Sequence, residues 1–267
     1  MFHSFELFRA YTGLTAGYTD RHGGCSQGSY ATFNCNLYCG DNEQAVLANR
    51  RQLEQTFGMP LITAHQQHGT EILSIGPEFY QTGPEERQIL LEGKDAIVTA
   101  ETGILIGVHT ADCIPLLLYD PQERVCAAIH AGWRGTAADI TGHTLNLLIH
   151  HYHCHPGYLA AAIGPGISQA AFEVGDEVYE AFRCQGFDMR RIARRFQPSG
   201  KWHMDLKAAN HDRLIQYGIP EKQIEDAGIC TWQDTDYFSA RRMGVRSGRI
   251  LTYIGMTEPT TNRQSIP

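Results

Sequence analysis

The chain has 267 residues, of which 42% are hydrophobic and 19% are charged, and its formal net charge at pH 7 is −7. This length and apolar content suffice for one large domain or two small ones. The negative charge argues against nucleic-acid binding through bulk electrostatics. No apolar run approaches the roughly 18–20 residues that a membrane span needs, so a membrane partner is not expected either.

The eight cysteines are dispersed along the chain, and no two of them form a C-x-x-C pair. The first residues lack the basic-then-apolar profile of a signal peptide. We therefore expect a cytoplasmic protein whose cysteines are mostly buried free thiols, with one or two of them taking part in chemistry.

The N-terminal residues 13–41 are rich in glycine and predict loops. Gly23 and Gly24 allow a sharp turn or the close approach of a ligand to the backbone. Arg21 beside them could bind a phosphate or a carboxylate. A turn that carries a surface arginine is the alternative for this segment.

A helix is predicted over residues 41–57, because apolar side chains recur on one face and a capping residue precedes them. Short strands are predicted at 61–64 and 71–75, and His68 lies in the tight connection between them. Residues 76–94 are polar and contain proline and glycine, so we expect a surface excursion there.

Four short apolar runs form the centre of the chain, and their glycine, proline and aspartate boundaries are typical of buried strands. Asp112 and Cys113 stand between two of these runs, and His130 closes the last one. A rigid sheet can aim side chains at strand ends into a cleft. The four predicted strands cover residues 95–99, 104–108, 114–119 and 125–129.

After His130, residues 137–151 show the spacing of one long helix. The start of a helix near Arg134 would favour anion binding. Residues 150–155 contain the H-x-H pattern of copper oxidases, but side chains two positions apart do not share a helix face. We expect a helix terminus here, and no catalytic copper cluster.

The remaining elements alternate without a break in composition or an internal repeat. This pattern favours one mixed α/β domain over residues 1–256, followed by a disordered tail at 257–267. The elements predicted in this part are strands at 158–163 and 249–254, helices at 176–184 and 205–217, and an exposed basic helix at 190–195.

His68, Cys113 and His130 each stand at or beside a strand end. Zn²⁺ accepts two imidazoles and one thiolate, and a catalytic site leaves its fourth position to water. The same residues also suit a metal-free hydrolase, with Cys113 as a thiolate nucleophile and His130 as its base. A buried thiol with two unrelated histidines is a third interpretation that spacing leaves open.

Several blocks of the chain resemble one family along nearly its whole length. The central block reads HTADCIPLLLYDP…AAIHAGWRGT, and others read DRHGGCSQGSYATFNCNLYCGD, QQHGTEI, AAIGPGISQAAFEVGDEVYEAF and CTWQDTDYFSARR. They resemble the YfiH/laccase-domain family, whose members carry the names polyphenol oxidase, peptidoglycan editing factor and purine nucleoside phosphorylase. The resemblance implies an α/β (α+β) fold, with mixed sheets in a sandwich and flanking helices, related to hydrolases of the cytotoxic-necrotizing-factor type.

The resemblance also implies a zinc enzyme, with His68, Cys113 and His130 as metal ligands. Implied activities are phosphorolysis of adenosine, inosine, guanosine and methylthioadenosine, and hydrolytic deamination of adenosine. Two blocks depart from the family pattern. Cys35 and Asn36 follow Asn34 where Leu-Gly is usual, and the usual Ser-Tyr-Arg-Arg reads Ser-Ala-Arg-Arg at 239–242.

On this hypothesis a purine nucleoside and phosphate are the small-molecule partners, and the oligomeric state is left open. Cys113 and His130 act in catalysis and Asp112 is the candidate proton shuttle, with a strand-end cap as its alternative role. Candidate substrate-binding residues are Arg21, Asn34, Arg134, Arg241 and Arg242.

Three other functions remain possible at this point. The first is a Cys113/His130 hydrolase or amidase acting on cell-wall precursors. The second is a copper-dependent oxidase of phenols. The third is a non-catalytic metal-binding module.

Overall fold

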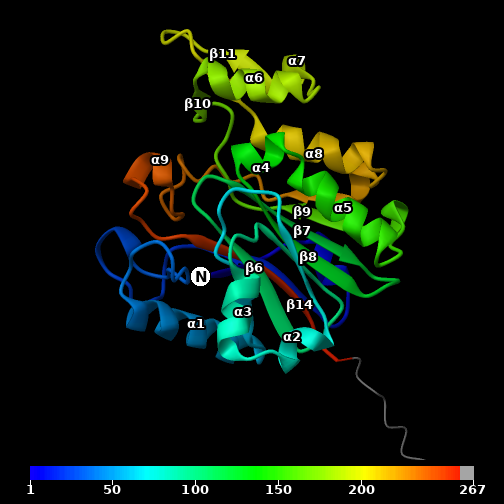
Figure 1. Cartoon of the computed structure of the whole chain (residues 1–267). Coiled ribbons are helices and arrows are strands. Elements are labelled where there is room, and N and C mark those ends of the chain that lie inside the picture. Colours follow the sequence, from blue (N-terminus) through cyan, green and yellow to red (C-terminus); the bar gives the residue numbers. More distant parts are fainter. Residues whose placement is uncertain (259–267) are drawn as a thin grey trace, which may run out of the picture.

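Two mixed β-sheets pack face to face in the computed structural model, which describes residues 1–258 (Figure 1). The first sheet has five strands and contains one parallel pair, β3 with β6, among antiparallel neighbours. Its order is β1 (Phe2–Ser4), β2 (Leu14–Thr19), β14 (Ile250–Met256), β6 (Ile104–Thr110) and β3 (Leu61–Thr63).

The second sheet has six strands and is also mixed, because β13 and β4 run parallel to their neighbours. The central strands β7 and β8 form a long antiparallel pair. Its order is β13 (Ile224–Asp226), β9 (Ala160–Ile163), β7 (Ile114–Asp120), β8 (Val125–Ala131), β5 (Ala96–Thr99) and β4 (Ile72–Ile75).

One apolar core lies between the two sheets. Ile106 and Ile254 of the first sheet share one apolar cluster with Ile97 and Leu117 of the second. Every residue of β6, β7 and β8 is buried, which agrees with their nearly continuous apolar sequences. The mixed sandwich predicted from the sequence is therefore confirmed.

Helices cover the outer faces of both sheets (Figure 1). The second core cluster joins α5 (Ile140–His150) and α8 (Leu206–Gln216) to the six-stranded sheet. On the other side, Leu53 of α1 (Glu43–Phe57) packs against Leu105 and Leu251. Asn42 caps α1 by accepting a hydrogen bond from the Ala45 amide, as the sequence predicts.

A small three-stranded sheet stands above the sandwich in Figure 1. The segment predicted as a basic helix at 190–195 is a short helix followed by a strand of this sheet. The small sheet has the order β10 (Glu173–Val174), β12 (Trp202–Met204) and β11 (Ala193–Arg195), and α6 (Asp176–Cys184) and α7 (Met189–Ile192) accompany it.

Three further predictions of secondary structure differ in part from the structure. The helix predicted at 137–151 is α5, which starts later, at Ile140, because Asp139 adopts a left-handed φ of 64° and caps it; a separate short helix, α4 (Trp133–Ala137), precedes it. The excursion at 76–94 contains α2 (Pro77–Gln81) and α3 (Pro84–Leu91), each begun by its proline. The loop predicted from residue 13 begins instead as strand β2.

The remaining short elements connect these layers. They are α9 (Ala240–Met243) and 3₁₀ helices at Leu7–Ala10, Gly28–Tyr30, Pro156–Tyr158 and Glu221–Gln223. Of the tail predicted at 257–267, Thr257 donates its amide to the Gly13 carbonyl at 2.8 Å, and residues 259–267 lie outside the described residues.

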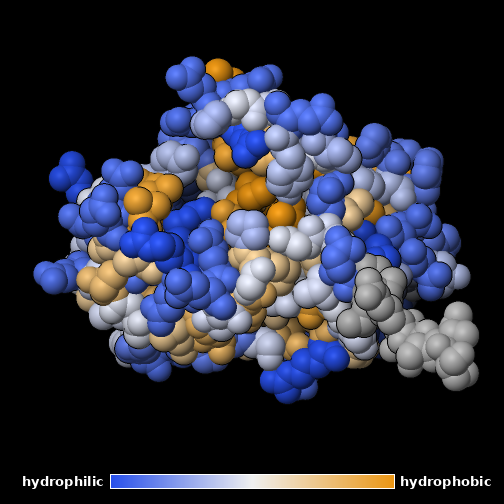
Figure 2. Space-filling model, turned by 90° about the horizontal axis from the view of Figure 1, so that it is seen from below, coloured by the Kyte–Doolittle hydropathy of each residue, from blue (hydrophilic) through white to orange (hydrophobic). Residues whose placement is uncertain are grey.

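Within residues 1–258, no helix has the length and apolar character needed to cross a membrane. Figure 2 shows the face seen from below Figure 1, where hydrophilic residues surround smaller apolar areas. Exposed large apolar side chains on the described surface include Tyr80 and Ile89 of the segment that follows β4. Single exposed apolar residues of this kind are normal on a globular protein.

Candidate metal centre

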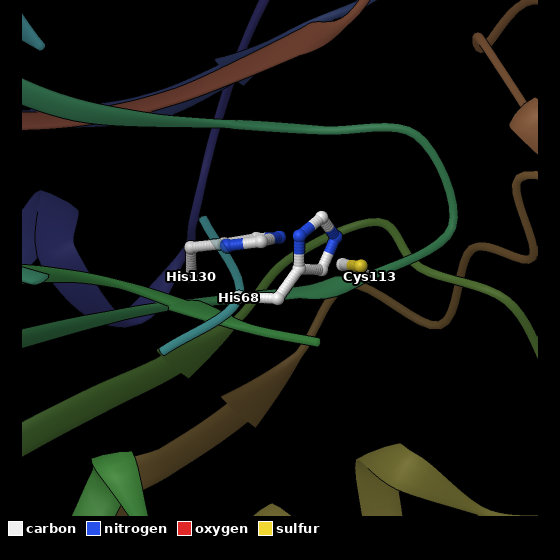
Figure 3. Close-up of side chains that lie close together, drawn as sticks. All are labelled: His68, Cys113 and His130. Atoms are coloured by element: carbon white, nitrogen blue, oxygen red, sulfur yellow. The ribbon is translucent and has the colours of Figure 1, made fainter. Parts of the chain in front are cut away.

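Three side chains meet at one point of the fold, from the connection between β3 and β4, the residue before β7 and the end of β8. One nitrogen each of His68 and His130 and the sulfur of Cys113 lie within 4.8 Å of one another. The two imidazole rings are 4.9 Å apart between centroids and stand at 72° to each other. Figure 3 shows the three side chains close together. The structure thus brings together the three residues that the sequence singled out.

The β7–β8 pairing brings Cys113 beside His130. Pro115 is paired with His130 and Ile114 with Ala131, so the residue just before β7 reaches the end of β8. Both strands are buried along their full length, and a slip of one residue would turn their side chains to the opposite faces. The register of the sheet therefore fixes the position of the thiol relative to the imidazole.

Asp112 holds the loop that carries the thiol. Its φ is 92°, a conformation rarely adopted by residues other than glycine. Its carboxylate accepts hydrogen bonds from Thr231 Oγ1 and the Arg241 amide, each at 2.7 Å. Its carbonyl accepts one from the Ile167 amide. These contacts favour a positioning role, and the proton-shuttle role of Asp112 stays a prediction.

The turn that carries His68 is wrapped around the carboxylate of Asp95. The backbone N–H groups of Gln67, His68 and Gly69 all donate to this carboxylate, at 3.2, 3.0 and 2.6 Å. Successive N–H groups that converge in this way form an anion-binding concavity. His68 itself has a positive φ of 61°, which the surrounding hydrogen bonds sustain.

The same carboxylate fixes His130. Asp95 Oδ1 lies 2.7 Å from His130 Nδ1, and both side chains are buried. Burial would raise the pKa of Asp95, but the hydrogen bonds from His130 and the turn amides hold that pKa below its usual value. With Nδ1 committed to Asp95, His130 is left with Nε2 for a ligand, an arrangement common to metal-binding histidines.

Cys113 and His130 stabilise each other's charged forms. Burial would raise the pKa of Cys113, but the nearby His130 and His68 outweigh it and lower the pKa to about 6. Burial would lower the pKa of His130, yet Cys113 and Asp95 raise it to about 9. A thiolate is the form that binds metals and attacks electrophiles.

Gly132 leaves the room that lets the three donors converge. A Cβ built on this residue would lie 2.8 Å from His68 Cδ2 and 3.1 Å from Cys113 Sγ. Two imidazoles and one thiolate also match the donor set of a catalytic zinc site. The residues present therefore fit a tetrahedral metal ion with three protein ligands.

The three residues form the one group of His, Cys, Asp or Glu side chains within residues 1–258 whose geometry could hold a metal ion. The histidine-rich segment 150–155 contributes no such group among these residues.

The three donors open onto a cleft of about 620 Å³. This volume is within the usual range for pockets that bind small molecules. Besides the three donors, the cleft is lined by Asn36, Tyr38, Cys39, His65, Gln66, His109, Thr110, Ala111, Asp112, Ile167, Phe172, Ala240, Arg241, Val245 and Arg249.

Of the five residues predicted to bind substrate, Arg241 lines this cleft. Its guanidinium lies over the Phe172 ring and donates to the Glu173 carbonyl. In the described part of the chain no carboxylate lies within ion-pair distance of Arg241, so its charge is available to an anion.

The other four predicted residues are not among the residues that line the cleft. Arg242 donates to the carbonyls of Thr231, Trp232, Asp234 and Tyr237, which ties the 231–237 loop to α9. Its guanidinium is therefore used in holding the fold.

The remaining three also have other contacts. Arg21 donates to the Ala31 carbonyl and lies over Phe238. Arg134 is exposed and stacks on Trp133. Buried Asn34 donates to Asp41 and accepts from the amide of Arg249. Substrate binding by these residues, including Arg242, is not supported by the geometry.

Sequence reasoning missed Asp95, His109 and the stacked pair of Tyr38 and His65. The proximity of Asp95 to His130 could have been predicted, because Asp95 directly precedes a buried strand that could pair with the strand ending in His130. The stacking of Tyr38 on His65 could not have been predicted, because the two residues come from loops that the sequence alone does not bring together.

A family model described as multi-copper polyphenol oxidoreductase laccase matches residues 15–257. The chain belongs to this laccase family. The match spans all elements from β2 to β14, including the three converging side chains. The resemblance found in the sequence is thereby confirmed.

Relatives in this laccase family are similar over almost their whole length. A purine nucleoside phosphorylase of Bacteroides thetaiotaomicron is 43% identical over 254 residues, which cover 94% of each chain. The adenosine deaminase RL5 from an unknown prokaryotic organism is 37% identical, over 93% of this chain and 96% of that one.

Solved structures of the laccase family show the same fold. YlmD from Geobacillus stearothermophilus superposes with a TM-score of 0.86 at 32% identity, over 95% of this chain and 94% of that one. YfiH from Bacillus licheniformis also has a TM-score of 0.86, at 27% identity over 96% of each chain.

Proposed function

We propose that this chain is a zinc-dependent purine nucleoside enzyme that uses His68, Cys113 and His130 as metal ligands. Its reactions are phosphorolysis of adenosine, inosine, guanosine and methylthioadenosine, and hydrolytic deamination of adenosine. The convergence of the three donors at the cleft is the observation that carries this proposal. The names of the relatives that are 43% and 37% identical support the substrate class.

Zinc fits the donor set better than copper does. The family description names several coppers, and an oxidase of that kind needs more than one cluster of ligands. Within residues 1–258 a single group of three donors is found. One thiolate and two imidazoles with an open fourth position are typical of a catalytic zinc site.

The chain's own residues prepare the site for chemistry. Asp95 keeps His130 in one tautomer and one orientation, and the Asp112 loop keeps Cys113 in place. Zinc, when bound, would act as a Lewis acid and would lower the pKa of a water molecule bound to it to near neutrality. Arg241 offers a positive charge to the attacking phosphate, which displaces the purine from C1′ of the ribose.

The Cys113–His130 pair favours a second candidate, a thiol hydrolase or amidase acting on cell-wall precursors. A lowered pKa of Cys113 beside an imidazole is also the arrangement of a cysteine nucleophile. This candidate predicts activity that survives chelators and is lost on thiol alkylation. The zinc enzyme predicts loss in both treatments, and a phenol oxidase predicts oxygen consumption with copper in the protein.

The test is a phosphate-dependent assay on metal-analysed protein. Hypoxanthine release from inosine and inosine formation from adenosine are measured before and after dialysis against a chelator, and again after Zn²⁺ is restored. We expect about one zinc per chain, loss of both activities in the metal-free protein and their recovery with Zn²⁺. Undiminished turnover without metal, or bound zinc with no nucleoside turnover, would overturn the proposal.

Substitutions of two neighbouring arginines are expected to have different effects, one on phosphate binding and the other on stability. Arg241→Met is expected to raise the KM for phosphate about 10- to 100-fold, the worth of a charge-assisted hydrogen bond, with little change in Tm. Arg242→Met is expected to lower the Tm instead, because carbonyls of the 231–237 loop lose their donor. Phosphate-dependence curves and thermal melts of both variants check this. Equal effects on KM would contradict it.

A further inference from the structure

His109 is a buried histidine with no assigned task. It lies near the end of β6, and its side chain, 3% exposed, lines the cleft that contains the metal ligands. Neither of its ring nitrogens has a hydrogen-bond partner among the described residues. Buried polar groups in proteins are nearly always paired, so an unpaired imidazole at a cleft wall calls for a ligand.

The backbone around this ring is held in place. The side-chain amide of Gln66 donates to the His109 carbonyl at 2.9 Å, and its oxygen accepts from the His109 amide at 2.8 Å. These two bonds tie the end of β6 to the segment that leads to His68. The imidazole is thus fixed in position relative to the metal ligands.

The two arginines whose charges act on His109 have other hydrogen-bond partners. Arg50 donates to the Leu61 and Cys35 carbonyls and to Thr63 Oγ1. Arg249 donates to carbonyls of the 245–248 loop. Burial, together with the charges of these two arginines, holds the pKa of His109 well below its usual value. The ring is therefore neutral near pH 7.

A neutral imidazole has one N–H donor and one acceptor nitrogen, and the tautomer decides which is which. In most buried histidines a partner on one nitrogen selects the tautomer. His109 lacks such a partner among residues 1–258, so neither tautomer is selected and each buried ring nitrogen can serve as a donor or as an acceptor.

A stacked aromatic pair also lines the cleft. Tyr38 stacks on His65 with centroids 4.1 Å apart and planes at 18°, and Glu92 holds His65 through both carboxylate oxygens. Tyr38 is 43% exposed and lines the cleft together with His109. A planar heterocycle needs a stacking face and a polar partner at its edge, and residues lining this cleft supply both.

Other residues of the cleft suit the rest of a nucleoside. Arg241, Phe172 and Ile167 line the same cleft, and the charge of Arg241 favours the phosphate that attacks the ribose. Deamination of adenosine requires C6 of the base beside the metal ligands. His109 lines the same cleft as the metal ligands, so its side chain is a candidate partner for the edge of the base that carries C6.

We propose that His109 recognises the 6-substituent of the purine ring, accepting a hydrogen bond from a 6-amino group and donating one to a 6-oxo group. This inference rests on the proposed function and extends it. It explains how one pocket admits adenosine, which carries the amino group, and inosine, which carries the oxo group.

The test compares substrates with and without a 6-substituent. Wild type, His109→Met and His109→Gln are assayed with adenosine, inosine and purine riboside, which has hydrogen at C6, and binding of all three is measured by calorimetry. His109→Met is expected to lower kcat/KM and affinity about tenfold or more for adenosine and inosine, and less than about twofold for purine riboside. His109→Gln keeps a donor and an acceptor, and should retain most of both values.

His203→Met is the matched control, because His203 is 8% exposed and does not line the cleft. Equal losses for all three nucleosides, or no loss for any, would overturn the role of His109. If wild type binds nucleosides without turning them over, the proposed function fails. The affinities of wild type and the His109 variants for the three nucleosides then test the role of His109 on their own. Failure to bind any of the three overturns both.

Discussion

Replacing Cys113 by alanine is expected to abolish metal binding and nucleoside turnover together. The thiolate is one of three donors held within 4.8 Å of one another, and two imidazoles alone leave the ion with half of a tetrahedral shell. Loss of a residue that only hydrogen-bonds a metal ligand lowers metal affinity or activity by up to about 100-fold. Because Cys113 is itself a ligand, we expect metal affinity and kcat/KM each to fall by more than that. Metal analysis and the inosine assay on the same preparation measure both.

Two further variants distinguish a ligand from a nucleophile. His68→Ala keeps the Cys113–His130 pair but removes a metal donor, so the zinc enzyme loses activity and a thiol hydrolase keeps it. Cys184→Ala is the control for removal of a thiol, because Cys184 is exposed at the end of α6 and does not line the cleft. Retention of both zinc and turnover by Cys113→Ala would show that the proposed metal centre is wrong.

The sequence predicted the core of the site because the relevant signals are local. β6, β7 and β8 are continuous apolar runs between turn residues, and such runs are recognisable without any tertiary information. Cys113 and His130 flank two strands joined by a short turn at Asp120, so their meeting follows from ordinary hairpin pairing. The sandwich likewise follows from many short strands with amphipathic helices between them.

The parts that the sequence did not predict depend on distant contacts. The role of Asp95 arises only when the 67–69 turn folds around it, and nothing in the local pattern specifies that turn. Strand β2 was missed because glycines surround it and its pairing partner β14 lies at the other end of the chain. The later start of α5 after Asp139 needs a left-handed residue that helical spacing does not reveal.

The arginines predicted to bind substrate show the same limit, because their contacts depend on tertiary structure. Arg241 and Arg242 are adjacent, and composition gives no reason to prefer one. In the structure the first lies in the cleft, while the second donates to main-chain carbonyls of the 231–237 loop. Arg21 and Arg134 are drawn to the rings of Phe238 and Trp133. An arginine's partner is decided by tertiary packing, so motif reading overestimates the number that bind substrate.

Asp95→Asn is expected to weaken metal binding and the fold at once. The carboxylate accepts four hydrogen bonds, three from backbone amides and one from His130. Each of its oxygens accepts two, so the amide nitrogen of asparagine would have to face donors in either orientation. The buried His130 also loses the charge that favours its protonated form in the metal-free protein.

The expected loss of metal affinity is about 10- to 100-fold, as for other partners that orient a ligating histidine. The metal-free protein should lose about 3 kcal/mol or more of its free energy of unfolding, because one member of a buried charged pair is removed. Zinc titrations against a competing chelator and denaturant unfolding of the metal-free protein measure the two effects.

Asp120→Asn is the matched control. Asp120 is equally buried, at the far end of β7, and one of its oxygens has no hydrogen-bond partner among the described residues. An amide nitrogen fits at that oxygen without facing a donor, so zinc affinity should stay within about twofold of wild type. If Asp95→Asn binds zinc as tightly as Asp120→Asn does, the carboxylate does not orient His130 for a metal. In that case the four hydrogen bonds of Asp95 serve the fold alone.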